Sequence, residues 1–221
     1  MNLHQVQSTV RVVGKRNIHR LQRWASLVTP YQPMAGGRQR LDAEYAKGKW
    51  EYLRDVSEFP RFSVVVGYCS YFKHGGKILE VGCGEGLLQE RLCPEQYSRY
   101  VGLDISAEAI KRAEHKANDK ITFIQGDAST YTFAERFDVV VFNECLEYFA
   151  DPRALVQRYE QFLEPQGVFI VSMFAGLNTT RTRRIWKQLE SLYPPATAAT
   201  VTTRPGYQWL IKVFRPARGS V

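Results

Sequence analysis

The sequence predicts a doubly wound α/β fold in which helices cover a mostly parallel sheet of seven strands. Apolar runs of strand type alternate with helix-compatible segments over residues 77–173, which is typical of parallel strands joined by right-handed crossovers. Three glycines, Gly82, Gly84 and Gly86, directly follow the first run. Ligands of such folds bind beyond the carboxyl ends of the strands. The glycine segment is therefore the first place to look for a binding site.

Each predicted strand is a short apolar run bounded by polar or turn-forming residues. The runs expected to be parallel are residues 77–81, Arg99–Asp104, Ile121–Gln125, Phe137–Phe142 and Val168–Met173. A hairpin is expected near the end of the chain, because Ala198–Thr203 and Tyr207–Phe214 flank the turn-forming Arg204-Pro205-Gly206. These two runs complete the seven strands.

The segments between the strands favour helices. Ser106 is a suitable N-cap for a helix that runs to about Asn118. Pro152 fits the first turn of a helix that ends near Leu163. Further helices are predicted over Leu87–Leu92 and Thr179–Tyr193.

The composition fits one well-packed domain with appendages, since 44% of the 221 residues are hydrophobic. No apolar run approaches the roughly eighteen residues that a bilayer-spanning helix needs, and residues 1–23 lack a hydrophobic signal core. We expect a soluble, cytoplasmic protein. The four cysteines form no Cys-x-x-Cys pair, which disfavours zinc and disulfides.

The basic residues are concentrated in the two tails. The net charge is +8, yet residues 42–190 hold 19 basic and 22 acidic residues, which leaves −3. Residues 1–41 hold seven Lys or Arg and residues 191–221 hold four, with no acid in either. An enzyme acting on nucleic acid would instead place a basic stripe around its cleft. The distribution disfavours nucleic acid as a partner, although RNA stays open as an alternative substrate.

Residues 1–40 are predicted to form a basic N-terminal arm. A short amphipathic helix is expected around Val10–Leu27, followed by an irregular linker with Pro30, Pro33 and two glycines. The alternative is an organelle transit peptide, because the start of the chain is rich in Arg and free of acids.

The glycine spacing separates two kinds of nucleotide ligand. Glycine permits a left-handed backbone and lets a ligand lie against the main chain. A dinucleotide fingerprint requires its third glycine at position 87, which is Leu. A cofactor with a pyrophosphate is therefore disfavoured.

The pattern Glu80-x-Gly82-x-Gly84-x-Gly86 resembles motif I of the class I S-adenosylmethionine-dependent methyltransferases. The resemblance covers about residues 41–214 and implies S-adenosylmethionine as the cofactor. It also implies a Rossmann-like methyltransferase core over residues 77–221 and a helical lid over residues 41–76. In this family helices occupy the place of residues 61–72, although the β-branched residues of that segment favour a strand.

The resemblance also implies roles for individual residues. Asp104 closes the second strand 22 residues after Gly82, where an acid accepts both hydroxyls of a ribose. Asp127 resembles the family acid that binds the adenine amino group, with the N–H of Ala128 on a ring nitrogen. The cofactor-binding residues predicted in this way are Arg61, Glu80, Gly82, Cys83, Gly84, Asp104, Ile105, Asp127, Ala128 and Asn143. Arg61 matches a residue that contacts the methionine carboxylate in relatives, and Tyr45 and Trp50 are candidates to cover the site.

Asn143 and Glu144, which follow the fourth strand, resemble the segment where cofactor and acceptor meet. Glu144 is the predicted catalytic residue, as a base or an orienting group, while a charge at a helix N-terminus is the alternative reading. No metal is predicted, because relatives that hold one have His where this chain has Tyr148. The Asn-Pro-Pro-Tyr signature of DNA and protein amide methylases is also absent.

The resemblance thus implies methyl transfer to an oxygen or nitrogen of a small molecule, such as a sugar, a polysaccharide precursor or a secondary metabolite. Four basic residues after the fifth strand suit an acidic acceptor if they are functional: Arg181, Arg183, Arg184 and Lys187. The alternatives are an RNA methyltransferase and a catalytically silent cofactor-binding module. The sequence leaves the oligomeric state open.

Overall fold

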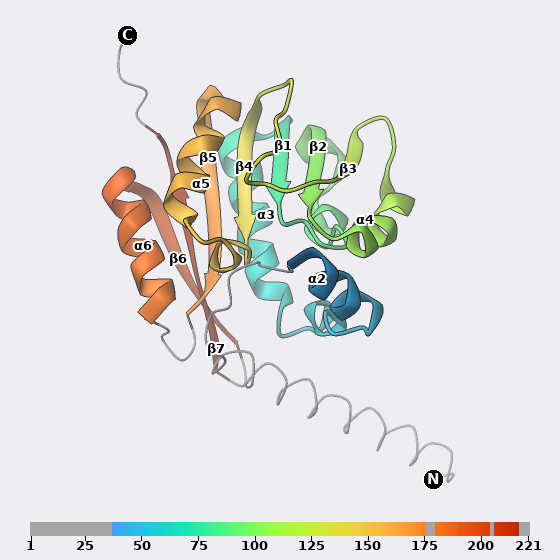
Figure 1. Ribbon diagram of the computed structural model, residues 1–221. Helices are drawn as coiled ribbons and strands as arrows, with labels where there is room; N and C mark the ends of the chain where they lie inside the picture. The colour runs from blue at the N-terminus through green and yellow to red at the C-terminus, as the bar shows by residue number, and fades with distance from the viewer. Residues whose placement is uncertain (1–36, 176–179, 204–205, 217–221) are drawn as a thin grey trace, which may run out of the picture. The chain divides into compact units, whose positions relative to one another are not determined.

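The computed structural model describes residues 37–175, 180–203 and 206–216. Within them, seven strands form one sheet in the order β3-β2-β1-β4-β5-β7-β6 (Figure 1). The strands are β1 Gly76–Val81, β2 Tyr97–Asp104, β3 Ile121–Gln125, β4 Phe137–Asn143, β5 Leu163–Phe174, β6 Pro195–Thr203 and β7 Tyr207–Phe214. The predicted fold class and strand number are confirmed.

The sheet changes direction of winding at β1, which pairs in parallel with β2 on one side and with β4 on the other. β3 and β5 extend the parallel part at its two ends. β7 is antiparallel to both β5 and β6. The carboxyl ends of β1 and β4 therefore lie side by side at the switch point, where doubly wound sheets bind ligands.

Helices lie on both faces of this sheet and beyond its carboxyl edge (Figure 1). The α-helices are α2 Gly37–Ala46, α3 Phe59–Lys73, α4 Ala107–Ala113, α5 Pro152–Tyr159 and α6 Thr180–Leu192. The expected helix over residues 61–72 is confirmed as α3, whose Val65 and Cys69 are completely buried. Tertiary burial thus overrides the strand preference of β-branched residues. The expected N-terminal arm and its helix lie outside the described residues.

The prediction of a helix over Leu87–Leu92 is wrong. This segment forms turns and a single 3₁₀ turn, η2 Gln89–Arg91. The Arg91 guanidinium donates to the Leu87 carbonyl, which a continuing helix would use for its own main chain. Leu92 is already extended, with φ −83° and ψ 131°.

Several other predicted boundaries shift. The first helix of the predicted lid, residues 41–76, ends at Ala46, since Gly48 takes a φ of 69° and Glu51–Arg54 forms the 3₁₀ turn η1. α4 and α5 are each followed by a 3₁₀ turn, η4 Glu114–Lys116 and η6 Glu160–Phe162. The caps are as predicted, because Ser106 accepts from Ala109 N at 3.2 Å.

The core is built on aromatic side chains between the sheet and α5. Phe133 stacks edge-on against Phe137 and Phe162, and Phe142 does so against Tyr159.

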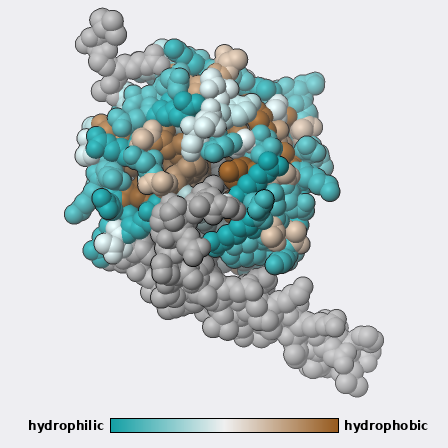
Figure 2. All heavy atoms as spheres, viewed as in Figure 1, coloured by the Kyte–Doolittle hydropathy of each residue, from teal (hydrophilic) through white to brown (hydrophobic). Residues whose placement is uncertain are grey.

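Figure 2 shows that hydrophobic residues gather across the middle of the viewed face, between hydrophilic margins. None of the helices in the described ranges is long and apolar enough to cross a bilayer.

Candidate active site

The glycine segment after β1 is a tight turn that leaves no room for a side chain at its glycine positions. Gly82, Gly84 and Gly86 have φ values of 72°, 54° and 74°. A Cβ at Gly82 would lie 2.6 Å from the Cβ of Cys145, and one at Gly84 would lie 2.7 Å from the Tyr45 hydroxyl. Only glycine satisfies both the backbone and the space here.

Asp104, at the end of β2, ties the turn to the start of α4. Its Oδ2 accepts from Gly84 N at 2.8 Å and its Oδ1 accepts from Ser106 N at 2.8 Å. Burial raises its pKa, while these two amides oppose the rise. Each carboxylate oxygen keeps a second lone pair for another donor. Ile105 lies between the two anchored residues and is half-buried.

A chain of buried polar groups runs behind the turn. At the end of β1, Glu80 accepts from the Tyr100 hydroxyl and, at 3.4 Å, from Asn143 Nδ2. Arg61 Nη1 donates to Asn143 Oδ1 at 2.6 Å, and Arg61 Nε donates to Glu58 Oε2 at 2.9 Å. Burial raises the pKa of Glu80 to about 7, against the bonds from Tyr100 and Asn143.

Three of the predicted site residues, Arg61, Glu80 and Asn143, are therefore joined directly, although they come from α3, β1 and β4. Arg61 Nε and Nη1 are engaged, whereas Nη2 donates to no residue that the structure describes. That amino group is available to a ligand.

Asp127 follows β3 and is exposed. Its Oδ1 accepts from Ser129 N at 2.8 Å, which shapes the loop, and Ala128 is buried. Gly126 N donates to the Asp104 carbonyl at 2.9 Å, so this loop begins beside the end of β2. Asp127, Asp104, Glu80 and Asn143 thus end or follow four neighbouring strands, as the sequence predicts.

Glu144 has the one left-handed backbone among the described non-glycine residues, with φ 59°. Its side chain turns to β5, where Oε1 accepts from Ser172 Oγ at 2.9 Å and Oε2 accepts from Phe174 N at 3.0 Å. Burial raises its pKa to about 7, with Arg61 opposing and Glu147 adding to the rise. A non-glycine residue in this conformation marks local strain of the kind that gathers at functional sites. The reading of Glu144 as a charge at a helix N-terminus does not fit this anchoring to β5.

The loop after Glu144 is held by α6. Arg181 Nε donates to the Glu147 carbonyl at 3.2 Å and Nη2 donates to the Phe149 carbonyl at 2.5 Å, while the Thr182 hydroxyl bonds to the Glu147 carboxylate. Arg181 therefore serves the backbone of the loop. The other basic residues of α6 that the sequence singles out are exposed: Arg183, Arg184 and Lys187.

The segment before α3 covers the glycine turn. Tyr45 of α2 is buried against Gly84, and Trp50 lies 5.9 Å from its ring centre. Asp42 accepts from Ser106 Oγ at 2.6 Å and from Glu108 N at 3.2 Å, which docks α2 on the start of α4. These contacts support the predicted covering role of the two aromatic residues.

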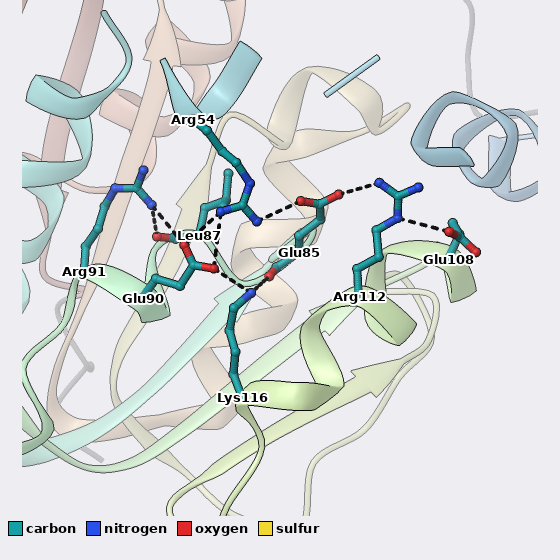
Figure 3. A network of polar contacts seen from close by, with 8 residues as sticks. All are labelled: Arg54, Glu85, Leu87, Glu90, Arg91, Glu108, Arg112 and Lys116. Atoms are coloured by element: carbon teal, nitrogen blue, oxygen red, sulfur yellow. Dashed lines mark hydrogen bonds and ion pairs between the residues drawn. The ribbon is translucent and has the colours of Figure 1, made fainter. Parts of the chain in front are cut away.

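Figure 3 shows a set of ion pairs that closes around the same turn. Arg54 of η1 bonds Glu85 at 3.1 Å and Glu90 at 3.2 Å. Arg112 and Lys116 reach the same two carboxylates from α4 and η4, at 3.0 Å and 2.8 Å. Sequence reasoning missed this set, because nothing local relates Arg54 to residues more than 30 positions away.

The described residues contain no group of three or more His, Cys, Asp or Glu side chains placed to hold a metal ion. They do fit an adenosyl cofactor. The turn is a cradle that a Cβ would fill, Asp104 has free acceptor capacity beside it, and Arg61 offers an unused amino group.

A family model described as "Methyltransferase domain" matches residues 79–171. Among curated proteins, ubiquinone biosynthesis O-methyltransferase from Actinobacillus pleuropneumoniae serotype 7 is 31% identical over 117 residues, covering 48% of this chain and 47% of the relative. The Erwinia tasmaniensis protein of the same name is 35% identical over 117 residues, covering 51% and 46%. The chain spans about half the length of the curated relatives it matches.

Solved structures share the fold. N-methyltransferase NodS from Bradyrhizobium japonicum WM9, in complex with S-adenosylhomocysteine, aligns with a TM-score of 0.70 at 23% identity, covering 82% of this chain and 98% of that one. Magnesium protoporphyrin IX methyltransferase from Synechocystis PCC 6803, with bound S-adenosylmethionine, aligns with a TM-score of 0.66 at 17% identity, covering 85% and 99%.

The fold and the matched domain are those of class I S-adenosylmethionine-dependent methyltransferases. The matched residues, 79–171, run from β1 to β5 and include the glycine turn. The domain implies S-adenosylmethionine as the cofactor. The roles of the individual site residues stay predictions.

Proposed function

We propose that this protein transfers a methyl group from S-adenosylmethionine to an oxygen or nitrogen of a small molecule, with oxygen favoured. The observation that carries the proposal is the meeting of three strand ends. The glycine turn follows β1, Asp104 ends β2 and bonds to that turn, and the anchored carboxylate of Glu144 follows β4, which lies beside β1. Oxygen is favoured because the curated relatives at 31–35% identity are named O-methyltransferases.

The proposed cofactor site uses the groups that keep hydrogen-bonding capacity. Asp104 is assigned to the ribose hydroxyls, the Arg61 Nη2 group to the methionine carboxylate, and Asp127 with the Ala128 amide to the adenine. Gly82, Cys83 and Gly84 form the floor, and Ile105 and Asn143 line the sides. When bound, S-adenosylmethionine supplies an electrophilic methyl group on its sulfonium. The assignments are supported by the spare lone pairs of Asp104 and the unused amino group of Arg61.

Glu144 is assigned the role of base or orienting group for the acceptor. Methyl transfer depends largely on alignment, and a hydroxyl acceptor must also lose a proton. A carboxyl with a pKa of about 7 is suited to accept that proton near neutral pH. Ser172 and the Phe174 amide fix its direction and leave each oxygen one further lone pair.

Two measurements test the proposal. In calorimetric titration, S-adenosylhomocysteine is expected to bind and NAD is not; tight NAD binding with no S-adenosylhomocysteine binding would refute the cofactor assignment. In a screen of hydroxyl and amine acceptors, release of S-adenosylhomocysteine identifies the acceptor class. E144Q should then lower kcat about 100-fold or more, while the exposed control E95Q should leave it unchanged.

A further inference from the structure

β6 is an edge strand of unusual composition. Pro195–Thr203 lies at the end of the sheet order and pairs only with β7 on its inner side. Its nine residues are proline, alanine, threonine and valine, with no charged side chain. An edge strand presents a row of unpaired N–H and C=O groups that other strands can pair with.

The outer edge of β6 is open in the part of the chain that the structure describes. Its main chain bonds to β7 along the ladder, and the Thr203 carbonyl accepts from Gly206 N in the turn that follows. No side chain of a described residue donates to or accepts from the outer edge. Pairing with another strand would therefore displace no existing hydrogen bond.

Proteins usually protect their edges with short strands, lysines, prolines or bulges. The other edge of this sheet, β3, has only five residues. β6 is nearly twice as long, has its proline at the first position, and has its one register shift there as well, between Pro195 and Thr197. The remaining length is regular and lacks these protective features.

One face of β6 is also open. Ala198, Thr200 and Thr202 alternate along the strand and are exposed, whereas Val201 on the other face is buried. Small and β-branched side chains on the exposed face let a second backbone approach closely. This face carries only small and β-branched side chains, whereas a bound peptide gains its specificity from pockets for alternate side chains.

We propose that the partner of this edge is β6 of a second copy of the chain, paired antiparallel about a two-fold axis. Centred on Ala199, the pairing sets Ala198 opposite Thr200 of the second copy and Thr197 opposite Val201. Eight of the nine residues then face alanine, threonine or valine, Thr203 faces Pro195, and no like charges meet. The two sheets become one continuous sheet, in the isologous arrangement typical of homodimers.

This dimer leaves both candidate active sites accessible. β4, β5 and β7 separate β1 and its glycine turn from β6. The proposal is therefore independent of the methyltransferase activity, and it concerns assembly alone.

Sedimentation equilibrium of the full chain over a range of concentrations tests it. The expected mass is about twice the 25.4 kDa of the monomer. A198K/T200K places lysine opposite lysine in both pairs across the axis, and should raise the dissociation constant about tenfold or more. A198K/T200E places lysine opposite glutamate in both pairs, and should restore the wild-type dissociation constant or lower it.

Q157K/Q166K is the matched control, because it adds the same two charges at exposed positions away from β6. It should dimerise like the wild type. A wild-type chain that is monomeric at every concentration overturns the proposal, and protection of the β6 amides in such a monomer would show that another segment of the chain covers the edge. A dimer that is unchanged in A198K/T200K overturns it as well.

Discussion

The buried pair of Arg61 and Glu58 offers the sharpest test of the site's physical basis. Their side chains are 2% and 1% exposed, and the bond between them is 2.9 Å long. R61M removes the cation and leaves the buried charge of Glu58 without its arginine. Breaking a buried pair in this way costs about 3–5 kcal/mol. Asn143 Oδ1 loses its 2.6 Å donor in the same variant, which places the expected loss at the upper end of this range.

The double variant E58Q/R61M separates the two contributions. It removes both members of the pair, so the carboxylate that has lost its arginine is replaced by a neutral amide and most of the lost stability should return. The measurement is urea unfolding followed by circular dichroism, with the wild type, E58Q, R61M and the double variant forming a complete cycle. R61M should therefore be less stable than E58Q/R61M.

Two results would refute this reasoning. A loss below about 1 kcal/mol in R61M would mean that the pair is solvated in solution, as surface pairs are. A double variant no more stable than R61M would mean that packing of the arginine, over the Phe62 ring at 4.0 Å, matters more than its charge.

Three further predictions concern the turn, its ion pairs and the two perturbed carboxyls. G84A should cost about 1–2 kcal/mol, because φ is 54° and the new methyl meets the Tyr45 hydroxyl; thermal melts should show that adding Y45F returns part of the loss, and no loss in G84A would contradict the contact. R54A should cost only about 0.5–1 kcal/mol, since its side chain is 48% exposed; the difference in urea midpoint should vanish in high salt, and persistence would indicate a packing role. Glu80 and Glu144 bind protons more tightly in the folded state, with pKa values near 7 against about 4.5. The free energy of unfolding should therefore fall as pH rises from about 4.5 to 7, and E144Q should flatten this slope in pH-dependent unfolding, whereas an unchanged slope would exclude Glu144 as its source.

The strands could be predicted because their signal is local. Ile121–Gln125 and Tyr207–Phe214 match their predicted bounds, since each is an apolar run that ends at polar or turn-forming residues. Alternation with helices then determines the sheet direction, and the carboxyl ends must gather at one edge. The row of Asp127, Asp104, Glu80 and Asn143 follows from these rules.

The prediction of a helix over Leu87–Leu92 failed because contacts with distant residues, and not the local sequence, decide the conformation of this segment. Its propensity is helical, but the Arg91 side chain takes the Leu87 carbonyl and Arg54 holds Glu85 and Glu90 from another segment. Local preference is a weak term, and contacts of this kind override it.

The sequence by itself determined the fold class, the cofactor class and which residues stand at the strand ends, because these depend on patterns within a few neighbouring positions. Only the tertiary structure decided what those residues touch. Arg61 meets Asn143 across 82 positions, Ser106 meets Asp42 across 64, and Ser172 meets Glu144 across 28. Such pairs form when packing brings distant segments together in a low-dielectric interior, where an unpaired charge is costly. That cost selects the partners, and no local pattern in the sequence records it.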